Sequence, residues 1–329
     1  MKILAIRFAR FGDVVLLLPA LSQLKESFPD AQLTFLTGHR CAPLGELCPA
    51  IDEVISVDRI ALRDGPIFGA VRDAGRLIRD IRRRRFDLVV DFHSFRETNL
   101  LARLSGAPKR IGMKRHSGPY LSFCFNYPPV IEDKSIHVAE MFRRVVEGIV
   151  RNPSAGGSGF AIPGHVEQWA RAAVPAGPRL TLYVDAPVPE RIWPPEYFAQ
   201  IADYAIEKLG ATVTVISGDS GEHLAERVRG ASRCGKQVSI FTHVSVPELA
   251  ALIASSRLFI SNDTGPMHIG PAVGVPTLGL FSVGYPEHFR PTGPRDRFFR
   301  ENPIERIEAN EVIEAAEQMW TITGPDSQR

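Results

Sequence analysis

Short apolar segments that suit β-strands alternate with longer helical segments along both halves of this 329-residue chain. Strands separated by helices of this length form βαβ units, in which helices cover both faces of a parallel sheet. The alternation therefore predicts an α/β fold with doubly wound sheets. In the first half we expect strands at Lys2–Phe8, Gln32–Thr37, Glu53–Val57, Asp87–Phe92 and Arg110–Met113, and helices at Val14–Phe28, Phe68–Arg85, Glu97–Leu104 and Val138–Val150.

A stretch rich in proline, glycine and serine divides the chain, which is typical of a linker, although Val166–Ala173 within it suits a short helix. The sequence thus predicts an N-terminal Rossmann-like domain over 1–155, a linker over 156–178 and a C-terminal Rossmann-like domain over 179–329, facing each other across a cleft. In the second half we expect strands at Arg179–Val184, Thr212–Ser217, Leu258–Ser261 and Thr277–Phe281, and helices at Pro195–Leu209, Glu222–Arg229, Val246–Ala254, Met267–Val273 and Glu308–Trp320.

Composition and cysteine content exclude several classes of protein. A hydrophobic fraction of 44% and a charged fraction of 23% suit a globular protein and argue against disorder or a coiled coil. The four cysteines form no CxxC pair and have no histidine nearby at zinc-ligand spacing, so we expect no zinc site. A chain of this length does not require a disulfide framework, so we expect a reducing cytoplasm. The apolar segment at the start of the sequence is interrupted by Arg7, Arg10 and Asp13 and is far shorter than the ~20 residues of a membrane span. We therefore expect neither a secretory signal peptide nor a membrane-spanning helix there.

Charge is distributed unevenly between the two halves. Residues 1–150 contain 23 basic and 17 acidic side chains, a net charge of +6, which leaves −4 for the remainder. This asymmetry indicates an anionic partner for the first half. The run Arg82–Arg85 complements the dipole at the end of a helix, or alternatively faces an anionic membrane surface. Nucleic acid is not expected, because no aromatic side chains interleave with the run.

Ligands of doubly wound sheets bind at the carboxyl ends of the strands, which directs attention to the loops there. Arg10-Phe11-Gly12-Asp13 follows the first strand, and Gly12 permits a tight turn and close approach of a ligand. Asp13 is expected at or near the N-cap of the next helix, where capping is one role. The other is that of a general base at the mouth of the cleft.

A second loop, Ser261–His268, suits a helix start that binds phosphate. Asp263 or Thr264 can cap, Gly265 exposes its N–H, and Pro266 is tolerated in a first turn. Free N–H groups and the positive end of the helix dipole form an anion site, to which His268 can donate. The alternative is a well-capped helix with a surface histidine.

Two further loops contribute weaker signals. Arg191 precedes Trp193-Pro194-Pro195, and its guanidinium suits bidentate phosphate binding, although a solvated loop arginine is the plainer interpretation. Gly218 and Glu222 belong to another strand-to-helix loop, where Glu222 can accept hydrogen bonds from a ribose diol. His93 and Ser94 follow a buried strand, and we interpret them as lining of the cleft rather than as a nucleophile and its base.

Several well-known motifs are absent from the sequence. There is no Asp-x-Asp pair for a divalent ion on a diphosphate, no GxGxxG after a strand, no Walker loop and no GxSxG elbow. The sequence therefore argues against a metal-dependent sugar transferase of the Asp-x-Asp type, a dinucleotide dehydrogenase, a P-loop enzyme and an α/β-hydrolase.

In combination these segments resemble the heptosyltransferases of glycosyltransferase family nine, over essentially the whole chain. The resemblance is carried by the following segments, of which the last two are the most specific: Phe11-Gly12-Asp13-Val14, Leu18-Pro19-Ala20-Leu21, Asp87-Leu88-Val89-Val90-Asp91, Lys109-Arg110-Ile111-Gly112, Trp193-Pro194-Pro195-Glu196-Tyr197-Phe198, Val246-Pro247-Glu248-Leu249-Ala250-Ala251-Leu252-Ile253, Asn262-Asp263-Thr264-Gly265-Pro266-Met267-His268 and Gly274-Val275-Pro276-Thr277.

The resemblance implies a two-domain GT-B fold, inversion without a metal or other cofactor, and a nucleotide-activated heptose donor, typically ADP-heptose. It implies that Asp13 is the general base and that an acidic residue near Glu222, beside Gly218, contacts the nucleoside. The donor diphosphate is expected at Arg191, Asp263, Thr264, Gly265, Pro266, Met267 and His268. The acceptor, a phosphorylated Kdo–lipid A core, is expected against the N-terminal domain, with Arg10, Gly12, His93 and Arg96 as candidates on that side.

We expect a cytoplasmic monomer, with peripheral contact to the inner membrane as a further expectation. The chain departs from the family pattern at three places: Arg191 stands where lysine is common, Tyr183-Val184-Asp185 replaces a Gly-Ala pair, and Ser282–Pro286 replaces a Gly-Pro-Thr-rich loop. Two other functions stay open at this point. One is a GT-B enzyme with another nucleotide sugar and glycan acceptor, or an epimerase, and the other is a non-catalytic protein that binds sugar nucleotides.

Overall fold

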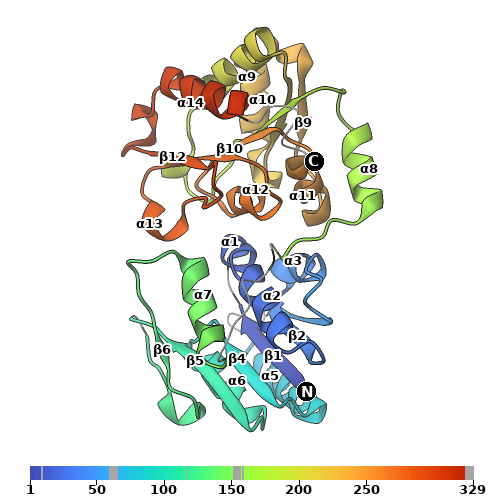
Figure 1. Cartoon of the computed structure of the whole chain (residues 1–329), viewed down its shortest axis with the longest axis vertical. Helices are drawn as coiled ribbons and strands as arrows, with labels where there is room; N and C mark the ends of the chain where they lie inside the picture. The colour runs from blue at the N-terminus through green and yellow to red at the C-terminus, as the bar shows by residue number, and fades with distance from the viewer. Residues whose placement is uncertain (9, 59–65, 117, 151–156, 158, 323–329) are drawn as a thin grey trace. The chain divides into compact units, whose positions relative to one another are not determined.

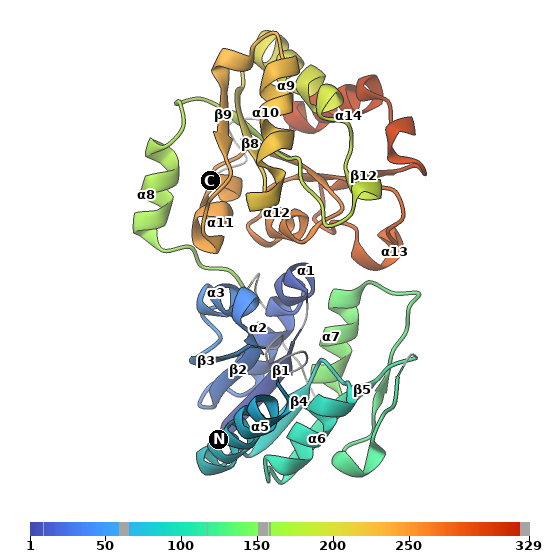
Figure 2. The ribbon, with the colours of Figure 1, turned by 180° about the vertical axis from the view of Figure 1, so that it is seen from behind.

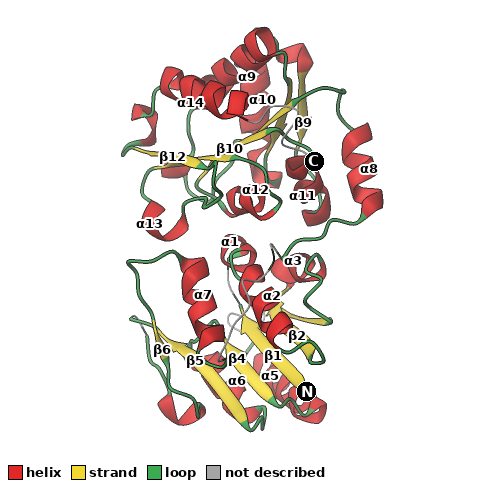
Figure 3. Ribbon diagram, viewed as in Figure 1, coloured by secondary structure: helices red, strands yellow, loops and turns green. Residues whose placement is uncertain are grey.

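A computed structural model of the chain describes residues 1–8, 10–58, 66–116, 118–150, 157 and 159–322. The chain divides into two compact units, Met1–Ala161 and Ile162–Arg329. Among the described residues each unit contains one six-stranded parallel sheet with helices on both faces (Figures 1 and 3). The predicted doubly wound α/β architecture is therefore confirmed in both halves of the chain.

In the first unit, the sheet order is β3-β2-β1-β4-β5-β6. Its strands are β1 (Lys2–Arg7), β2 (Gln32–Gly38), β3 (Glu53–Val57), β4 (Leu88–Asp91), β5 (Lys109–Lys114) and β6 (Val130–Ile131). Its α-helices are α1 (Phe11–Val15), α2 (Leu18–Ser27), α3 (Ala42–Glu46), α5 (Ile67–Arg84), α6 (Arg96–Leu104) and α7 (Val138–Glu147). Helices α2 and α7 pack together on one face of the sheet, and α5 and α6 lie on the other, as Figure 2 shows.

The second unit repeats this topology, with the order β12-β11-β10-β7-β8-β9. Its strands are β7 (Arg179–Tyr183), β8 (Thr212–Ile216), β9 (Val238–Phe241), β10 (Leu258–Asn262), β11 (Thr277–Phe281) and β12 (Arg297–Arg300). Its α-helices are α8 (Gly164–Ala172), α9 (Pro195–Leu209), α10 (Glu222–Ala231), α11 (Val246–Ala254), α12 (Ile269–Ala272), α13 (Pro286–Phe289) and α14 (Ala309–Ile322).

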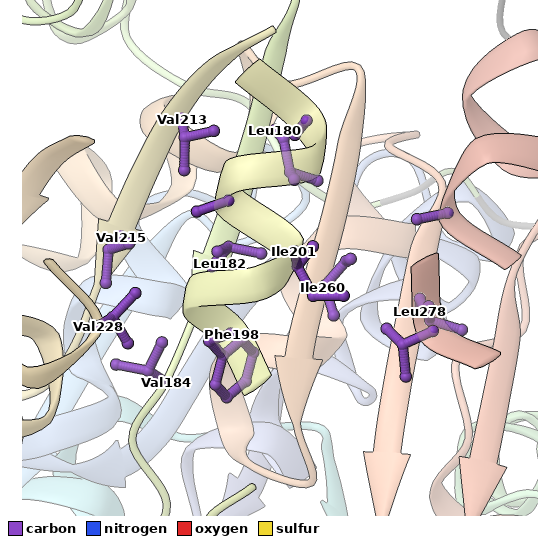
Figure 4. Close-up of a cluster of buried hydrophobic side chains, with 14 of the residues drawn as sticks. Leu180, Leu182, Val184, Phe198, Ile201, Val213, Val215, Val228, Ile260 and Leu278 are labelled. Carbon is purple, nitrogen blue, oxygen red and sulfur yellow. The ribbon is translucent and has the colours of Figure 1, made fainter. Parts of the chain in front are cut away.

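The core of the second unit lies between its sheet and α9, α10 and α14. Leu182 and Ile260 of neighbouring strands pack with Phe198 and Ile201 of α9 (Figure 4). All four side chains are at most 2% exposed, and burying each one contributes about 1.5–3 kcal/mol. These strands are buried on both faces, which explains why they read as continuous apolar runs rather than alternating ones.

The boundary between the units differs from the predicted linker over 156–178. Along the chain, the first unit ends at Ala161 and the second begins at Ile162, and α8 packs against α11 within the second unit. Residues 162–178 therefore belong to a folded unit despite their proline and glycine content. Of the predicted linker's first residues, 156 and 158 lie outside the described part of the chain.

Two predicted helices need correction, and three strands were not predicted. The helix expected at Val14–Phe28 is two helices, α1 and α2, because Pro19 lacks the N–H that a continuous helix requires. The helix expected at Met267–Val273 is instead a 3₁₀ turn over Gly265–His268 followed by the single turn α12. The outer strands β6, β9 and β12 were not expected, since edge strands are short and often carry charges such as Arg297 and Arg300.

None of the helices in the described ranges combines the length and the apolar character needed to span a bilayer.

Candidate active site

Each sheet has one position at which the strand order reverses, between β1 and β4 in the first unit and between β7 and β10 in the second. Side chains and loops at the carboxyl ends of such strands form the ligand crevice of doubly wound sheets. The residues singled out in the sequence follow these strands or the adjacent β8. We call the loops after β1 and β4 the Asp13 edge, and the loops after β7, β8 and β10 the Asp263 edge.

At the Asp13 edge, Asp13 is held by an arginine. Nη2 of Arg7 lies 3.0 Å from Oδ2 of Asp13, and the two side chains are 3% and 17% exposed. Arg7 ends β1, and Asp13 lies in the first turn of α1. The ion pair therefore fixes the carboxylate at the carboxyl end of the central strand, with part of its surface open to solvent.

Arg7 is itself held from several sides. Its Nη1 donates to the backbone oxygen of Phe92 over 2.6 Å, which connects β1 to the loop after β4. Its guanidinium lies 4.9 Å from the ring centre of Phe142 in α7. Burial lowers the pKa of Arg7, and the Asp13 carboxylate opposes that shift. A planar cation with several donors can make these contacts simultaneously, whereas a lysine has a single ammonium group.

The capping role considered for Asp13 is not observed. The N-cap of α1 is Arg10, and no side chain caps this helix end. Gly12 is buried, and Arg10 is exposed beside it. Asp13 is thus paired with a cation instead of with backbone N–H groups at the N-cap.

The loop after β4 is organised by a second buried carboxylate, Asp91. Its Oδ1 accepts hydrogen bonds from the backbone N–H groups of His93 and Ser94, over 3.0 and 2.8 Å. Its Oδ2 accepts a hydrogen bond from Nδ2 of Asn99 over 3.0 Å. These bonds hold Ser94 in a left-handed conformation with φ of 54°. The tight turn places His93 and Arg96 at the Asp13 edge, where His93 is buried and Arg96 is exposed.

Asp91 gives the stability of the protein a defined pH dependence. Burial raises the pKa of Asp91 to about 6, against the opposing effect of its hydrogen-bond donors. The unfolded chain has an aspartate pKa near 4, so the folded protein binds this proton more tightly. The contribution of Asp91 to stability is therefore complete below about pH 4 and is lost as the pH rises through about 6.

We expect the Asp91→Asn variant to lose this pH dependence. Between pH 4.5 and 7.5, the free energy of unfolding of the wild type should fall relative to the variant by about 2 kcal/mol, because each pKa unit within this window corresponds to about 1.4 kcal/mol. Urea denaturation across this range measures the difference, with the exposed Asp30→Asn change as control. If the difference in the free energy of unfolding between wild type and variant does not change with pH, Asp91 is not the source of the pH dependence.

Aromatic and cationic side chains surround the same turn. The His93 ring lies edge-on to Phe8 and Phe95, with ring centres 5.8 and 4.5 Å apart. The guanidinium of Arg115 lies over the Phe95 ring at 4.6 Å. Together with Arg96, Arg115 gives this loop cationic surface of the kind that suits an anionic acceptor.

At the Asp263 edge, Arg191 and Asp263 form a second ion pair. Nη1 of Arg191 lies 3.1 Å from Oδ2 of Asp263, with side chains 27% and 8% exposed. Burial raises the pKa of Asp263, and Arg191 opposes that shift. Arg191 is thus not the freely solvated arginine of the plainer interpretation. Its position is fixed, while other N–H groups of the guanidinium can bind a phosphate.

The segments at this edge are joined by Asn262, the last residue of β10. Its Oδ1 accepts the backbone N–H of Trp193 at 3.2 Å, and its Nδ2 donates to the backbone oxygen of Val184 at 2.9 Å. One side chain therefore ties the end of β10 to the loop after β7. This sets the register between Arg191 and the Asp263–His268 segment.

The predicted phosphate-binding helix is shorter than expected. Thr264 precedes a 3₁₀ turn over Gly265–His268, which includes Pro266 and Met267, and its side chain does not cap that turn. Because this turn and α12 are short, the local N–H groups matter more than a helix dipole. The interpretation of His268 as a surface residue is wrong, since it is only 5% exposed.

The absence of a side chain at Gly284 leaves room for the Asp263 carboxylate beside Arg191. A Cβ atom added at Gly284 would lie 2.1 Å from Oδ2 of Asp263, much closer than atoms can approach. We expect Gly284→Ala to displace Asp263 and with it Arg191, which weakens nucleotide binding at least about tenfold by loss of a charge-assisted contact. Calorimetric titration with a nucleoside diphosphate measures this, with Gly164→Ala, where a Cβ meets open space, as control. Unchanged affinity in the Gly284→Ala variant would contradict it.

The residues expected near the nucleoside follow the adjacent strand, β8. Gly218 and Glu222 follow β8, and the Glu222 side chain is 60% exposed. Asp185, after β7, packs against this loop, since a Cβ added at Gly218 or Gly221 would lie 3.0 or 2.7 Å from its Oδ2. Asp185 also accepts the N–H of Ala186. The carboxylate therefore contacts the β8 loop.

Sequence reasoning missed Arg7, Asp91 as a loop organiser, Asn262 and Gly284. A signal was present for three of them, because Arg7, Asp91 and Asn262 are polar residues at the ends of otherwise apolar strands. Gly284 had no such signal, because its requirement depends on a carboxylate 21 positions earlier. In the parts of the chain that the structure covers, no cluster of His, Cys, Asp and Glu has the arrangement of a metal site.

The chain is similar to known proteins in both sequence and fold. The model of glycosyltransferase family 9 (heptosyltransferase) matches residues 74–318. Lipopolysaccharide heptosyltransferase 3 of Escherichia coli K12 is 24% identical, over 97% of this chain and 98% of its own length. Lipopolysaccharide heptosyltransferase 1 of Pseudomonas aeruginosa is 26% identical over 87% of this chain and 80% of its own.

Solved structures agree with the fold. The glycosyl transferase family 9 protein from Veillonella parvula superposes with a TM-score of 0.83 at 23% identity, and 97% of each chain is covered. Escherichia coli heptosyltransferase WaaC with ADP gives a TM-score of 0.79 at 19% identity, over 97% of this chain and 100% of its own. These likenesses confirm the predicted GT-B fold.

Proposed function

Because the chain belongs to glycosyltransferase family 9, the heptosyltransferases, and is thus a glycosyltransferase, we propose that it transfers a heptose from ADP-heptose to the inner core of lipopolysaccharide. The observation that carries this proposal is the Asp13 carboxylate, fixed by Arg7 at the strand-order reversal of the first sheet. The names of the relatives support the acceptor class, and the solved structure of WaaC with ADP supports the nucleotide.

In the proposed reaction, Asp13 removes a proton from an acceptor hydroxyl. That oxygen forms a bond to the anomeric carbon of the heptose from the face opposite the nucleotide, and the bond from that carbon to the diphosphate oxygen breaks. The configuration is inverted, and the electron pair leaves with the nucleoside diphosphate. A positioned general base of this kind contributes roughly 10²–10⁴-fold to the rate.

The leaving diphosphate gains negative charge, which the Asp263 edge is suited to stabilise. Arg191, His268 and the N–H groups of the Gly265–His268 turn supply donors there, and Asp263 keeps Arg191 in place. Such preorganised donors stabilise developing charge without reorganisation. We therefore propose that transfer proceeds without a metal or other cofactor, with Gly218 and Glu222 beside the nucleoside.

On the acceptor side, we propose that Arg10, Gly12, His93 and Arg96 contact a phosphorylated Kdo–lipid A core. The net charge of +6 over residues 1–150 favours such an anionic acceptor. The proposal includes a monomeric protein on the cytoplasmic side of the inner membrane, in peripheral contact with it.

A thermal-shift comparison of ADP, UDP and GDP tests the proposed donor. We expect stabilisation by ADP alone, by about 2.7 kcal/mol at a concentration 100 times the dissociation constant. The Arg191→Met variant should lose most of this stabilisation, whereas Arg227→Met, which removes an exposed arginine of the same unit, should keep it. Stabilisation by UDP or GDP instead of ADP would favour a different sugar nucleotide.

A further inference from the structure

The outer surface of helices α5 and α6 exposes apolar side chains, and we call it the α5–α6 face. Figure 2 shows the two helices side by side on the first unit's sheet. Phe68 and Val71 of α5 are 92% and 67% exposed, and Leu100 and Leu104 of α6 are 38% and 40% exposed. The opposite side of α5 is buried through Ile81, which packs in the core of the unit. Both helices are thus amphipathic, and their outer face is partly apolar.

Arginines accompany these apolar side chains. The two helices contain eight arginines and three acidic residues within their bounds. Arg72 and Arg76 pair with Asp73, and Arg84 pairs with Asp80 and Glu53. The arginines that form no ion pair with an acidic residue in the described ranges are Arg79, Arg82, Arg83, Arg96 and Arg103. The α5–α6 face is therefore both apolar and strongly cationic.

This combination suits a bilayer better than a protein. Helices that lie in a membrane interface insert Phe and Leu side chains and hold arginines at the level of the anionic headgroups. The centre of a protein interface is depleted of charge, and five arginines without an ion pair among the described residues would be costly to bury there. Anionic lipid headgroups pair with the arginines while those side chains remain hydrated.

The direction of α5 relates this face to the site. Arg84, at the end of α5, lies at the amino ends of the strands. It forms an ion pair with Glu53 at the start of β3, and its backbone oxygen accepts a hydrogen bond from Nζ of Lys2 at the start of β1. An α-helix of 18 residues is about 27 Å long. Phe68 and Val71 therefore lie toward the opposite end of the strands, which is the end that carries Asp13.

We propose that the α5–α6 face docks the protein on an anionic lipid bilayer, with Phe68 and Val71 inserted and Arg79, Arg82 and Arg83 at the headgroups. This inference deepens the proposed function, since a lipid-borne acceptor would then be met at the edge of the unit that carries the base. The evidence for the docking surface is the exposure and charge of its side chains. Docking can therefore be measured without a sugar donor or an acceptor.

Sedimentation with vesicles tests the proposal on the full-length protein. The wild type should bind vesicles of equal parts phosphatidylglycerol and phosphatidylcholine, and should not bind phosphatidylcholine alone. Phe68→Ser combined with Val71→Ser should weaken binding about tenfold through lost apolar burial. Arg79→Gln, Arg82→Gln and Arg83→Gln together should weaken it about a hundredfold, from about 1 kcal/mol per arginine near the surface.

The matched control changes three exposed arginines of the second unit, Arg171→Gln, Arg229→Gln and Arg306→Gln, for the same change in net charge. We expect it to bind as the wild type does. Both α5 variants should transfer heptose to a deacylated, soluble acceptor at the wild-type rate, so failure of docking and failure of transfer are separable.

Three results would overturn the proposal. One is a wild-type protein that does not bind the anionic vesicles, and another is a pair of α5 variants that bind them as the wild type does. The third is a dimer in light scattering that the Phe68→Ser, Val71→Ser variant abolishes, because a second copy would then cover the face.

Discussion

Replacing Asp13 by asparagine is expected to lower the turnover of heptose transfer by a factor of roughly 10²–10⁴, the usual contribution of a general base. The amide cannot take up the proton of an acceptor hydroxyl. Its oxygen can still accept the hydrogen bond from Arg7, so the local structure should persist. Single-turnover kinetics with a saturating donor measure the effect on the chemical step directly.

Donor affinity separates this role from a general loss of structure. The proposed diphosphate site lies in the second unit, so the Asp13→Asn variant should bind ADP as the wild type does. Asp30→Asn, an exposed change in the same unit, should keep full turnover. A fully active Asp13→Asn enzyme would remove Asp13 from the mechanism.

Replacing Arg7 by methionine is expected to have the largest effect on stability. The change leaves Asp13 without its cation and the backbone oxygen of Phe92 without its donor. Breaking a buried ion pair from one side costs about 3–5 kcal/mol, and we expect about 3 kcal/mol here because Asp13 retains 17% exposure. Urea denaturation at pH 7.5 measures the loss of free energy of unfolding.

A positioning role predicts a kinetic effect in addition to lost stability. At a temperature where the Arg7→Met protein is folded, kcat should fall while the KM for the donor stays near the wild-type value. Arg7→Lys should recover part of kcat, because the ammonium can pair with Asp13 without also reaching Phe92. The control is Arg84→Met, a half-exposed pair whose loss should cost under about 1 kcal/mol. Wild-type kcat in Arg7→Met would refute the positioning role.

The architecture was accessible from the sequence because its signals are local. Each central strand is a run of apolar side chains between turn residues, and burial on both faces makes that run continuous. The edge strand β12 lacks this signal, since Arg297 and Arg300 flank its two phenylalanines. The start of the second unit was also not predictable from the sequence, because α8 begins after Pro163 in a stretch whose composition suggests a linker. Only the packing of α8 against α11 shows that it belongs to the second unit.

For the candidate site, the sequence predicted the loops that carry the residues and not the ion pairs that these residues form. The sequence places Asp13 and Asp263 after the correct strands, because the carboxyl ends of parallel strands share one edge. It does not show that each carboxylate is paired with an arginine, Arg7 six positions earlier and Arg191 some 70 positions earlier. From the sequence alone, an aspartate at this position can either cap the helix or form an ion pair. Only the folded backbone shows which of the two roles it has.

The measurement closest to the central claim is mass spectrometry of a heptose-free inner-core acceptor incubated with the purified protein and ADP-heptose in the presence of EDTA. We predict that the acceptor gains the mass of one heptose with the wild type and far more slowly with Asp13→Asn. An acceptor whose mass does not change with the folded, ADP-binding wild type would contradict the account, and so would transfer that stops when EDTA is added.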